Sequence, residues 1–190
     1  AAKAPGVRDL VIIGGGVSGM AAALEAKKLR YDFVLLEAAE PFSTIANFPK
    51  HKPIYTYPQA MVPAGEIQFH AQVKEPLLAE LRAQTLAKGI EPVRARADRI
   101  ERRGGPLAVV IPDGNDLVAL RVIVAIGRSG NFRKLGVSGE DRGKVSNRLH
   151  DPSDYAGKDV LVVGGGDSAI EAAIALAKCG TRVTLSYRKK

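Results

Sequence analysis

The sequence predicts an α/β fold, in which parallel strands alternate with helices, and three observations support this class. The chain carries an internal repeat, because residues 10–19 and 160–169 are similar and their first glycines lie 150 positions apart. Each copy runs from a short apolar stretch through a glycine-rich turn into an alanine-rich stretch. The length of 190 residues, with 46% hydrophobic and 25% charged residues, is typical of a globular chain of one or two domains.

The first copy has the pattern Gly-x-Gly-x-x-Gly at residues 14–19, between a strand expected at 10–13 and a helix expected at 20–29. The first glycine allows a tight turn, the second lets the backbone approach a pyrophosphate, and the third position must be small. The pyrophosphate then lies on the helix N-terminus, whose N–H groups and dipole stabilise its charge. After a strand expected at 32–36, Glu37 can accept hydrogen bonds from both hydroxyls of an unphosphorylated adenosine ribose. FAD and NAD both fit this pattern.

The second copy has the same design but a different end to its second strand. Its strands are expected at 160–163 and 182–186, on either side of a helix expected at 170–178. Tyr187 stands where the first copy has Glu37. The next three residues are basic: Arg188, Lys189 and Lys190. Cationic side chains can pair with a 2′-phosphate, so this copy indicates NADP(H). The alternative for these residues is a solvated basic segment.

Between the copies, the sequence predicts a loop, a helix and an antiparallel meander. Residues 41–65 contain five prolines and keep no regular period, so we expect an ordered loop whose aromatic rings cover a cofactor or pack into the core. A helix is expected from Glu75 to the residue before Gly89, since Pro76 suits a first turn and glycine a C-terminus. Residues 91–124 alternate in polarity and contain glycine-rich turns, which predicts the meander beside the parallel sheet.

The net charge of +8 favours polyanions such as nucleic acid, anionic lipid or phosphorylated cofactors. We expect neither nucleic acid nor a membrane as partner, because no nucleic-acid-binding motif and no apolar run of ~20 residues is present. A basic cluster could dock an acidic partner such as a ferredoxin, or form a solvated strand face: Arg94, Arg96, Arg99, Arg102 and Arg103. The three histidines are too dispersed for a metal site. The single cysteine, Cys179, forms no internal disulfide, which favours a cytoplasmic location.

Three motifs together resemble those of a known superfamily. They are Gly164-Gly165-Gly166-Asp167-Ser168-Ala169-Ile170-Glu171, Asn47-Phe48-Pro49 and Val122-Ile123-Val124-Ala125-Ile126-Gly127. The chain resembles the flavoproteins with two dinucleotide-binding domains, and in particular their thioredoxin reductase-like branch. The resemblance implies a Rossmann-like FAD-binding domain over residues 1–127. A linker and the start of a second Rossmann-like, NADP-binding domain would follow over residues 128–190.

The resemblance also implies which residues contact the two cofactors. FAD is expected against Gly14, Gly15, Gly16, Ser18, Gly19, Glu37, Asn47 and Gly127. NADPH is expected against Gly164, Gly165, Gly166, Asp167, Ser168, Ala169, Glu171, Arg188 and Lys189. Arg188 and Lys189 would bind the 2′-phosphate, and Glu171 would lie near the nicotinamide carboxamide. We expect no catalytic acid, base or nucleophile, because the cofactors carry the chemistry.

Differences from the branch narrow the expected activity. Thioredoxin reductases carry Cys-x-x-Cys just before the second glycine turn, where residues 144–150 of this chain contain no cysteine. Bacillithiol disulfide reductases, which are otherwise similar, have a cysteine in the first turn where Ser18 stands here. The Phe-x-Gly-x-x-x-His motif of flavin monooxygenases is missing. Ferredoxin–NADP reductases of this type lack the dithiol and keep Gly-Gly-Gly-Asp-Ser-Ala, so they match the pattern better.

We therefore expect a flavoprotein oxidoreductase that moves hydride from NADPH to FAD and passes electrons to an acceptor, plausibly an iron–sulfur protein. The alternative from another class is a non-catalytic dinucleotide-binding or redox-sensing module of a larger assembly. The resemblance also allows a homodimer. Because residues 160–187 supply only one strand–helix–strand unit of a doubly wound domain, we expect the chain to be a fragment.

Overall fold

The fold is described from a computed structural model of the chain. The described residues are 4–55, 62–102, 104–112, 114–128 and 132–188. Contacts divide the chain into two compact units, and each unit holds one glycine turn. The first unit comprises residues 1–46 and 54–131, and the second comprises residues 47–53 and 132–190. The domain boundary expected after residue 127 stays a prediction; the contacts associate residues 47–53 with the later part of the chain.

The first unit is built on a six-stranded sheet with the order β3-β2-β1-β6-β5-β4. The strands are β1 (Val7–Ile13), β2 (Phe33–Glu37), β3 (Val93–Arg94), β4 (Arg99–Arg102), β5 (Leu107–Val110) and β6 (Leu117–Val124). Strands β3, β2, β1 and β6 pair in parallel, whereas β6, β5 and β4 pair antiparallel. This confirms the predicted α/β class with its antiparallel meander. The expected meander began too early, because β3 extends the parallel half of the sheet instead.

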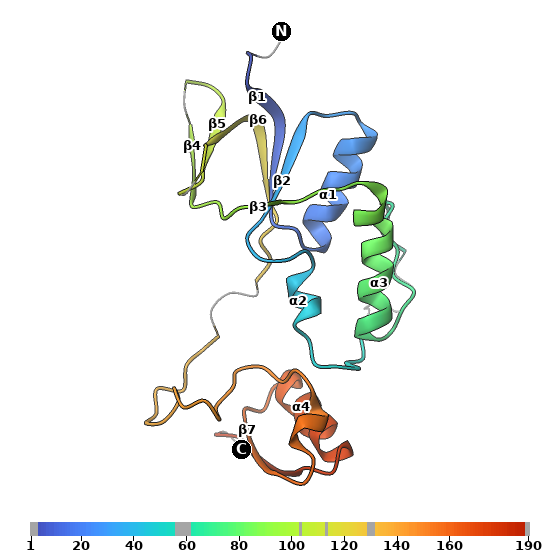
Figure 1. The fold of residues 1–190 in the computed structure, drawn as a ribbon, viewed down its shortest axis with the longest axis vertical. Helices are drawn as coiled ribbons and strands as arrows, with labels where there is room; N and C mark the ends of the chain where they lie inside the picture. The colour runs from blue at the N-terminus through green and yellow to red at the C-terminus, as the bar shows by residue number, and fades with distance from the viewer. Residues whose placement is uncertain (1–3, 56–61, 103, 113, 129–131, 189–190) are drawn as a thin grey trace. The chain divides into compact units, whose positions relative to one another are not determined.

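The helices of the first unit are α1 (Val17–Lys28), α2 (Ser43–Ala46), α3 (Lys74–Gln84) and the 3₁₀ helix η1 (Leu86–Lys88). In Figure 1, α1 and α3 lie on one side of β1 and β2, and β4 and β5 lie on the other. The side chains of β1 alternate accordingly. Leu10 and Ile12 enter the core with α1 and α3, whereas Val11 packs with Val109 and Ala119 of the meander. Strand β1 is therefore buried on both faces, as parallel strands usually are.

The helix expected from residue 75 to residue 88 is present but interrupted. Helix α3 ends at Gln84, and η1 carries the chain on to Lys88. Thr85 lies between them, fully buried, and its hydroxyl donates a hydrogen bond to the carbonyl of Leu81 at 2.7 Å. Gly89 then ends the segment with a φ of +74°, which confirms its expected role at the C-terminus.

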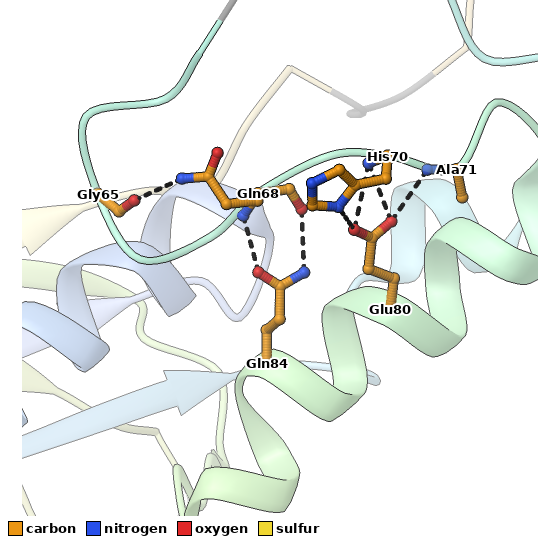
Figure 2. Close-up of polar contacts among 6 residues, drawn as sticks. All are labelled: Gly65, Gln68, His70, Ala71, Glu80 and Gln84. Atoms are coloured by element: carbon orange, nitrogen blue, oxygen red, sulfur yellow. Dashed lines mark hydrogen bonds and ion pairs between the residues drawn. The ribbon is translucent and has the colours of Figure 1, made fainter.

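Two side chains of α3 hold the segment that precedes it, as Figure 2 shows. The amide of Gln84 accepts a hydrogen bond from the N–H of Gln68 at 2.7 Å and donates one to its carbonyl at 2.9 Å. The carboxylate of Glu80 accepts from the N–H groups of His70 and Ala71 and contacts the imidazole of His70. Burial alone would raise the pKa of Glu80, but these bonds outweigh it and hold the pKa below its usual value of 4.5. We call this group of contacts the α3 clasp.

The second unit contains one strand–helix–strand arrangement. Its elements are the 3₁₀ helix η2 (Pro152–Tyr155), β7 (Asp159–Val163), α4 (Asp167–Lys178) and β8 (Arg182–Ser186), and β7 pairs with β8 in parallel. Several large apolar side chains of these elements are exposed: Leu161, Val163, Ile170, Ile174 and Leu185. Across the described part of the chain, no helix has both the length and the apolar character needed to cross a bilayer.

Residues 47–53 are attached to the second unit by two ion pairs. Lys50 pairs with Asp151, and the N–H of Lys50 donates to the carbonyl of His150 at 2.7 Å. Lys52 pairs with Glu171 of α4. The hydrogen bond from Lys50, together with those from Ser153, holds the pKa of Asp151 well below its usual value of 3.8. These contacts explain why residues 47–53 group with a part of the chain about 100 residues away.

Candidate functional site

The first turn, residues 14–19, connects β1 to α1 with its open side at Gly16. Gly14 has a φ of +109°, and its N–H donates to the carbonyl of Leu36 at 2.8 Å. A Cβ on Gly14 would lie 2.5 Å from the carbonyl oxygen of Ala125, so only glycine fits. At Gly16, the N-cap of α1, a Cβ would meet no described heavy atom within 4 Å, and no described side chain caps the helix. Among the described residues, the N-terminus of α1 thus has no capping side chain and has room for a group beside Gly16, two features that suit anion binding.

The third position of the first turn tolerates no side chain. Gly19 is buried on α1, and a Cβ there would lie 1.8 Å from the carbonyl oxygen of Gly14. The sequence predicted that this position must be small. The structure shows that it must be glycine, because the backbone of α1 at Gly19 lies too close to the backbone of Gly14 to leave room for even a methyl group.

Glu37, at the end of β2, is fixed against the first turn. Its Oε2 accepts a hydrogen bond from the N–H of Gly15 at 2.6 Å, and its Oε1 accepts one from the N–H of Ala39 at 2.9 Å. Each carboxylate oxygen can accept a further hydrogen bond, so the group remains able to bind a ribose diol. Sequence reasoning placed Glu37 beside the nucleotide but missed its bond to Gly15.

The second turn, residues 164–169, repeats the backbone geometry of the first. Gly164 has a φ of +140°, and its N–H donates to the carbonyl of Ser186 at 2.9 Å, 150 positions after the Gly14–Leu36 bond. Gly166 is the N-cap of α4, and among the described atoms none lies within 4 Å of a Cβ built there. Ala169 takes the third position, and its Cβ lies 3.2 Å from a Cβ built on Gly164. The internal repeat is therefore structural as well as sequential.

The two turns differ at the side chain that contacts their second glycine. In the second turn this side chain is Tyr187, which follows β8. A Cβ on Gly165 would lie 2.3 Å from Cδ2 of Tyr187, so the tyrosine ring packs directly on the glycine. Glu37 contacts Gly15 in the matching place.

A comparison with family models decides the family. The model described as "Pyridine nucleotide-disulphide oxidoreductase" matches residues 11–190, which include both turns. The chain belongs to this family. Membership confirms the family resemblance that the motifs predicted, and with it the oxidoreductase class. Proteins of this family use FAD and NADPH, in agreement with the cofactors that the sequence predicts.

Curated proteins that are similar to this chain carry several names. A ferredoxin–NADP reductase from Ignicoccus hospitalis is 29% identical over 184 residues, which cover 96% of this chain and 57% of the relative. The bacilliredoxin reductase Bdr from Bacillus subtilis is also 29% identical, over 94% of this chain and 56% of the relative. The chain thus spans little more than half the length of these relatives.

Solved structures show the same fold. The bacillithiol disulfide reductase Bdr from Bacillus cereus has a TM-score of 0.79 and 27% identity, over 94% of this chain and 57% of that structure. The thioredoxin reductase from Lactococcus lactis has a TM-score of 0.65 and 26% identity, over 94% of this chain and 55% of that structure. These matches confirm the Rossmann-like fold that the glycine turns predict.

The structure brings most of the predicted cofactor residues to one of the two turns. Ser18 is exposed on the first turn of α1, and Gly127 follows β6 with a φ of +67°. Asp167 and Ser168 are exposed in the first turn of α4. Arg188 is exposed immediately after Tyr187. Lys189 lies outside the described residues.

Asn47 and Glu171 occupy different surroundings from the turns. Asn47 lies in the segment that groups with the second unit. The carboxylate of Glu171 pairs with Lys52, whose ammonium group also lies 5.4 Å from the centre of the Phe48 ring. Sequence reasoning did not single out Lys52, since a lysine in a proline-rich loop carries no signal of its own. The expected roles of Asn47 and Glu171 stay predictions.

The structure also places the other features that the sequence singled out, except Arg103, which lies outside the described residues. In the basic cluster, Arg99 pairs with Asp98 and Glu101, so part of the cluster is neutralised locally. Cys179 is half-buried at the end of α4. Among the described residues, no group of three or more potential metal ligands lies together.

Proposed function

We propose that this chain is the nucleotide-binding part of an FAD-dependent oxidoreductase that takes hydride from NADPH and passes electrons to an acceptor. One observation carries the proposal: the chain holds two glycine turns with the same backbone geometry but with opposite side-chain chemistry beside the second glycine. Glu37 is an acceptor at the first turn, whereas Tyr187 and the cation Arg188 follow the matching strand at the second. Two turns of this kind suit two different dinucleotides.

The first turn suits FAD. A Cβ on Gly16 would meet no described atom within 4 Å, and no described side chain caps α1, so the helix N-terminus can hold a pyrophosphate without a lysine. Glu37 is already oriented by the N–H groups of Gly15 and Ala39. It can accept ribose hydroxyls without first ordering its own side chain. The acidic group also disfavours a 2′-phosphate at this turn, by charge repulsion.

The second turn suits NADPH. Gly166 leaves the N-terminus of α4 open, as Gly16 does for α1. Arg188 provides a guanidinium group at the strand end, where the ribose of a bound dinucleotide lies. A guanidinium binds phosphate oxygens through paired hydrogen bonds, which an unphosphorylated ribose cannot accept in the same way.

The proposed acceptor is a one-electron iron–sulfur protein. FAD, when bound, supplies the conversion between a two-electron donor and a one-electron acceptor. The protein contributes binding and orientation, and residues 144–150, where thioredoxin reductases carry Cys-x-x-Cys, contain no cysteine. Support for this acceptor comes from the relatives named ferredoxin–NADP reductase, such as the one from Ignicoccus hospitalis.

Exchanging one glycine at each turn tests the proposal. Gly16→Val and Gly166→Val both add a side chain where a Cβ has free space, so the fold should survive, but each side chain would fill a pyrophosphate site. We expect the full-length Gly16→Val protein to lose its yellow chromophore. The Gly166→Val protein should keep its flavin, but anaerobic NADPH should no longer bleach the flavin absorption bands.

The wild-type titration is the reference for both variants. We expect NADPH to bleach the flavin at much lower concentration than NADH. A Gly16→Val protein that remains yellow would contradict the assignment of FAD to the first turn. A colourless wild-type protein, or flavin that neither nucleotide reduces, would favour a binding module without turnover.

A further inference from the structure

Helix α4 carries acidic side chains near its N-terminus, whereas α1 does not. Asp167 lies in the first turn of α4, but the first turn of α1 contains no acidic residue. Glu171 follows one turn later, at the position where α1 has Ala21, since both residues come seven positions after the first glycine of their motif. The two glycine turns, which match in backbone geometry, therefore differ by two carboxylates on the helices that follow them.

These carboxylates are unfavourable for the ligand that we propose at the second turn. NADPH carries a 2′-phosphate besides its pyrophosphate, so it is strongly anionic. Glu171 lies about 6 Å along the helix axis beyond Asp167, and the Cα–Cβ bonds of a helix point back towards its N-terminus. At such separations a carboxylate repels a phosphate. It also offsets the positive end of the helix dipole, which would otherwise stabilise the pyrophosphate.

A lysine from a distant part of the chain compensates the charge of Glu171. The ammonium group of Lys52 pairs with the Glu171 carboxylate and lies 5.4 Å from the centre of the Phe48 ring. The side chain of Lys52 is 18% exposed, so solvent screens this pair less than it screens a surface pair. Residues 47–53 are attached to the same unit by a second ion pair, from Lys50. The cation is therefore held beside α4 by the segment that carries it.

We propose that Lys52 is a positioning residue of the NADPH site, which neutralises Glu171 and so allows the N-terminus of α4 to bind an anionic dinucleotide. The inference rests on the proposed function. Lys52 acts on the nucleotide through Glu171 and not by contacting a phosphate, so its effect depends on the carboxylate. The first turn needs no such cation, because α1 has Ala21 at the matching position.

The test measures the dissociation constant of NADP⁺, which does not reduce the flavin, by isothermal titration calorimetry on the full-length flavoprotein. We expect Lys52→Met to weaken NADP⁺ binding about tenfold, because the Glu171 carboxylate is left without its cation. Glu171→Gln keeps the size of the side chain and removes its charge, so it should strengthen binding about threefold. The double variant should bind NADP⁺ within about twofold of wild type.

The opposite signs of the two single variants separate charge compensation from a structural role. If the ion pair only held α4 in shape, both single variants would weaken NADP⁺ binding, because each breaks the same pair. Lys52→Arg keeps the charge and should bind NADP⁺ nearly as wild type does. The loss in Lys52→Met should also shrink in about 1 M salt, where interactions between charges are screened.

Lys50→Met is the matched control. It removes a lysine and an ion pair from the same segment but leaves Lys52 and Glu171 in place. We expect NADP⁺ affinity to change by less than about twofold in this variant. Equal weakening in Lys50→Met and Lys52→Met would mean that attachment of the segment or total charge matters, and would overturn the inference. Bound flavin and circular dichroism report whether each variant is folded.

Two other results would contradict the role of Lys52. A double variant that binds NADP⁺ as weakly as Lys52→Met would mean that Lys52 contacts the dinucleotide itself. Glu171→Gln without stronger binding would mean that the carboxylate does not oppose the ligand, and this variant decides the matter alone if Lys52→Met does not fold. A wild-type protein that binds no NADP⁺ would instead overturn the proposed function, so the two failures are distinguishable.

Discussion

The contact between α1 and the first turn predicts a large effect for one added methyl group. In Gly19→Ala the new Cβ would lie 1.8 Å from the carbonyl oxygen of Gly14, whereas real Cβ contacts are essentially never under 3.0 Å. Helix α1 would have to move by about 1.2 Å away from β1. The surrounding core leaves no space for this, because Met20 and Ala23 are fully buried beside it. We expect a loss of about 2–3 kcal/mol in the free energy of unfolding.

Thermal and urea unfolding, followed by far-UV circular dichroism without added nucleotide, would measure this loss. For a chain of this size the expected decrease in Tm is about 4–12 °C. Gly16→Ala is the control, since its Cβ has free space and its stability should change by less than about 0.5 kcal/mol. If Gly19→Ala were as stable as Gly16→Ala, the close backbone crossing inferred for the first turn would be refuted.

Two further predictions concern polar contacts. Glu80→Gln should lower the free energy of unfolding by about 1 kcal/mol at neutral pH, because the amide has one acceptor oxygen for the two N–H groups of the α3 clasp. Because the folded-state pKa of Glu80 is lowered, the stability difference between wild type and Glu80→Gln should be complete above pH 4.5 and vanish as the pH falls through the folded-state pKa. Urea unfolding between neutral pH and about pH 3 would measure this difference. A difference that does not change with pH would contradict the prediction. Lys52→Met should cost under about 1 kcal/mol, because the side chains of Lys52 and Glu171 are 18% and 36% exposed. The cost should shrink in about 1 M salt, and a salt-independent cost would show that packing on Phe48 matters more than charge.

Local patterns were sufficient to predict the elements that carry the two turns. A glycine turn between an apolar run and an alanine-rich stretch specifies strand, turn and helix from neighbouring residues alone. The helices were expected to begin after the turns, at residues 20 and 170, but they begin at Val17 and Asp167. The reason is physical: the last residues of each glycine motif, Val17-Ser18-Gly19 and Asp167-Ser168-Ala169, already form the first turn of the helix, before the alanine-rich stretch from which the helix was predicted.

Contacts between distant residues could not be predicted in the same way. Alternating polarity shows that residues 93–94 suit a strand, but it does not say that β3 pairs with β2 rather than with β4. The position of Tyr187 showed a missing carboxylate, but not that its ring packs on Gly165. The pairing of Lys52 with Glu171 depends on the path of the chain, since the two residues are 119 positions apart.

The attachment of residues 47–53 to the second unit has a consequence for synthesis. Lys50 precedes Asp151 by 101 residues, and Lys52 precedes Glu171 by 119. At about 5–20 residues per second, both lysines are synthesised about 5–24 seconds before their carboxylate partners. During that interval the flanking residues can already join the first unit. Residues 47–53 can therefore make these contacts only after residues 150–171 have been synthesised, so the second unit is completed late in synthesis.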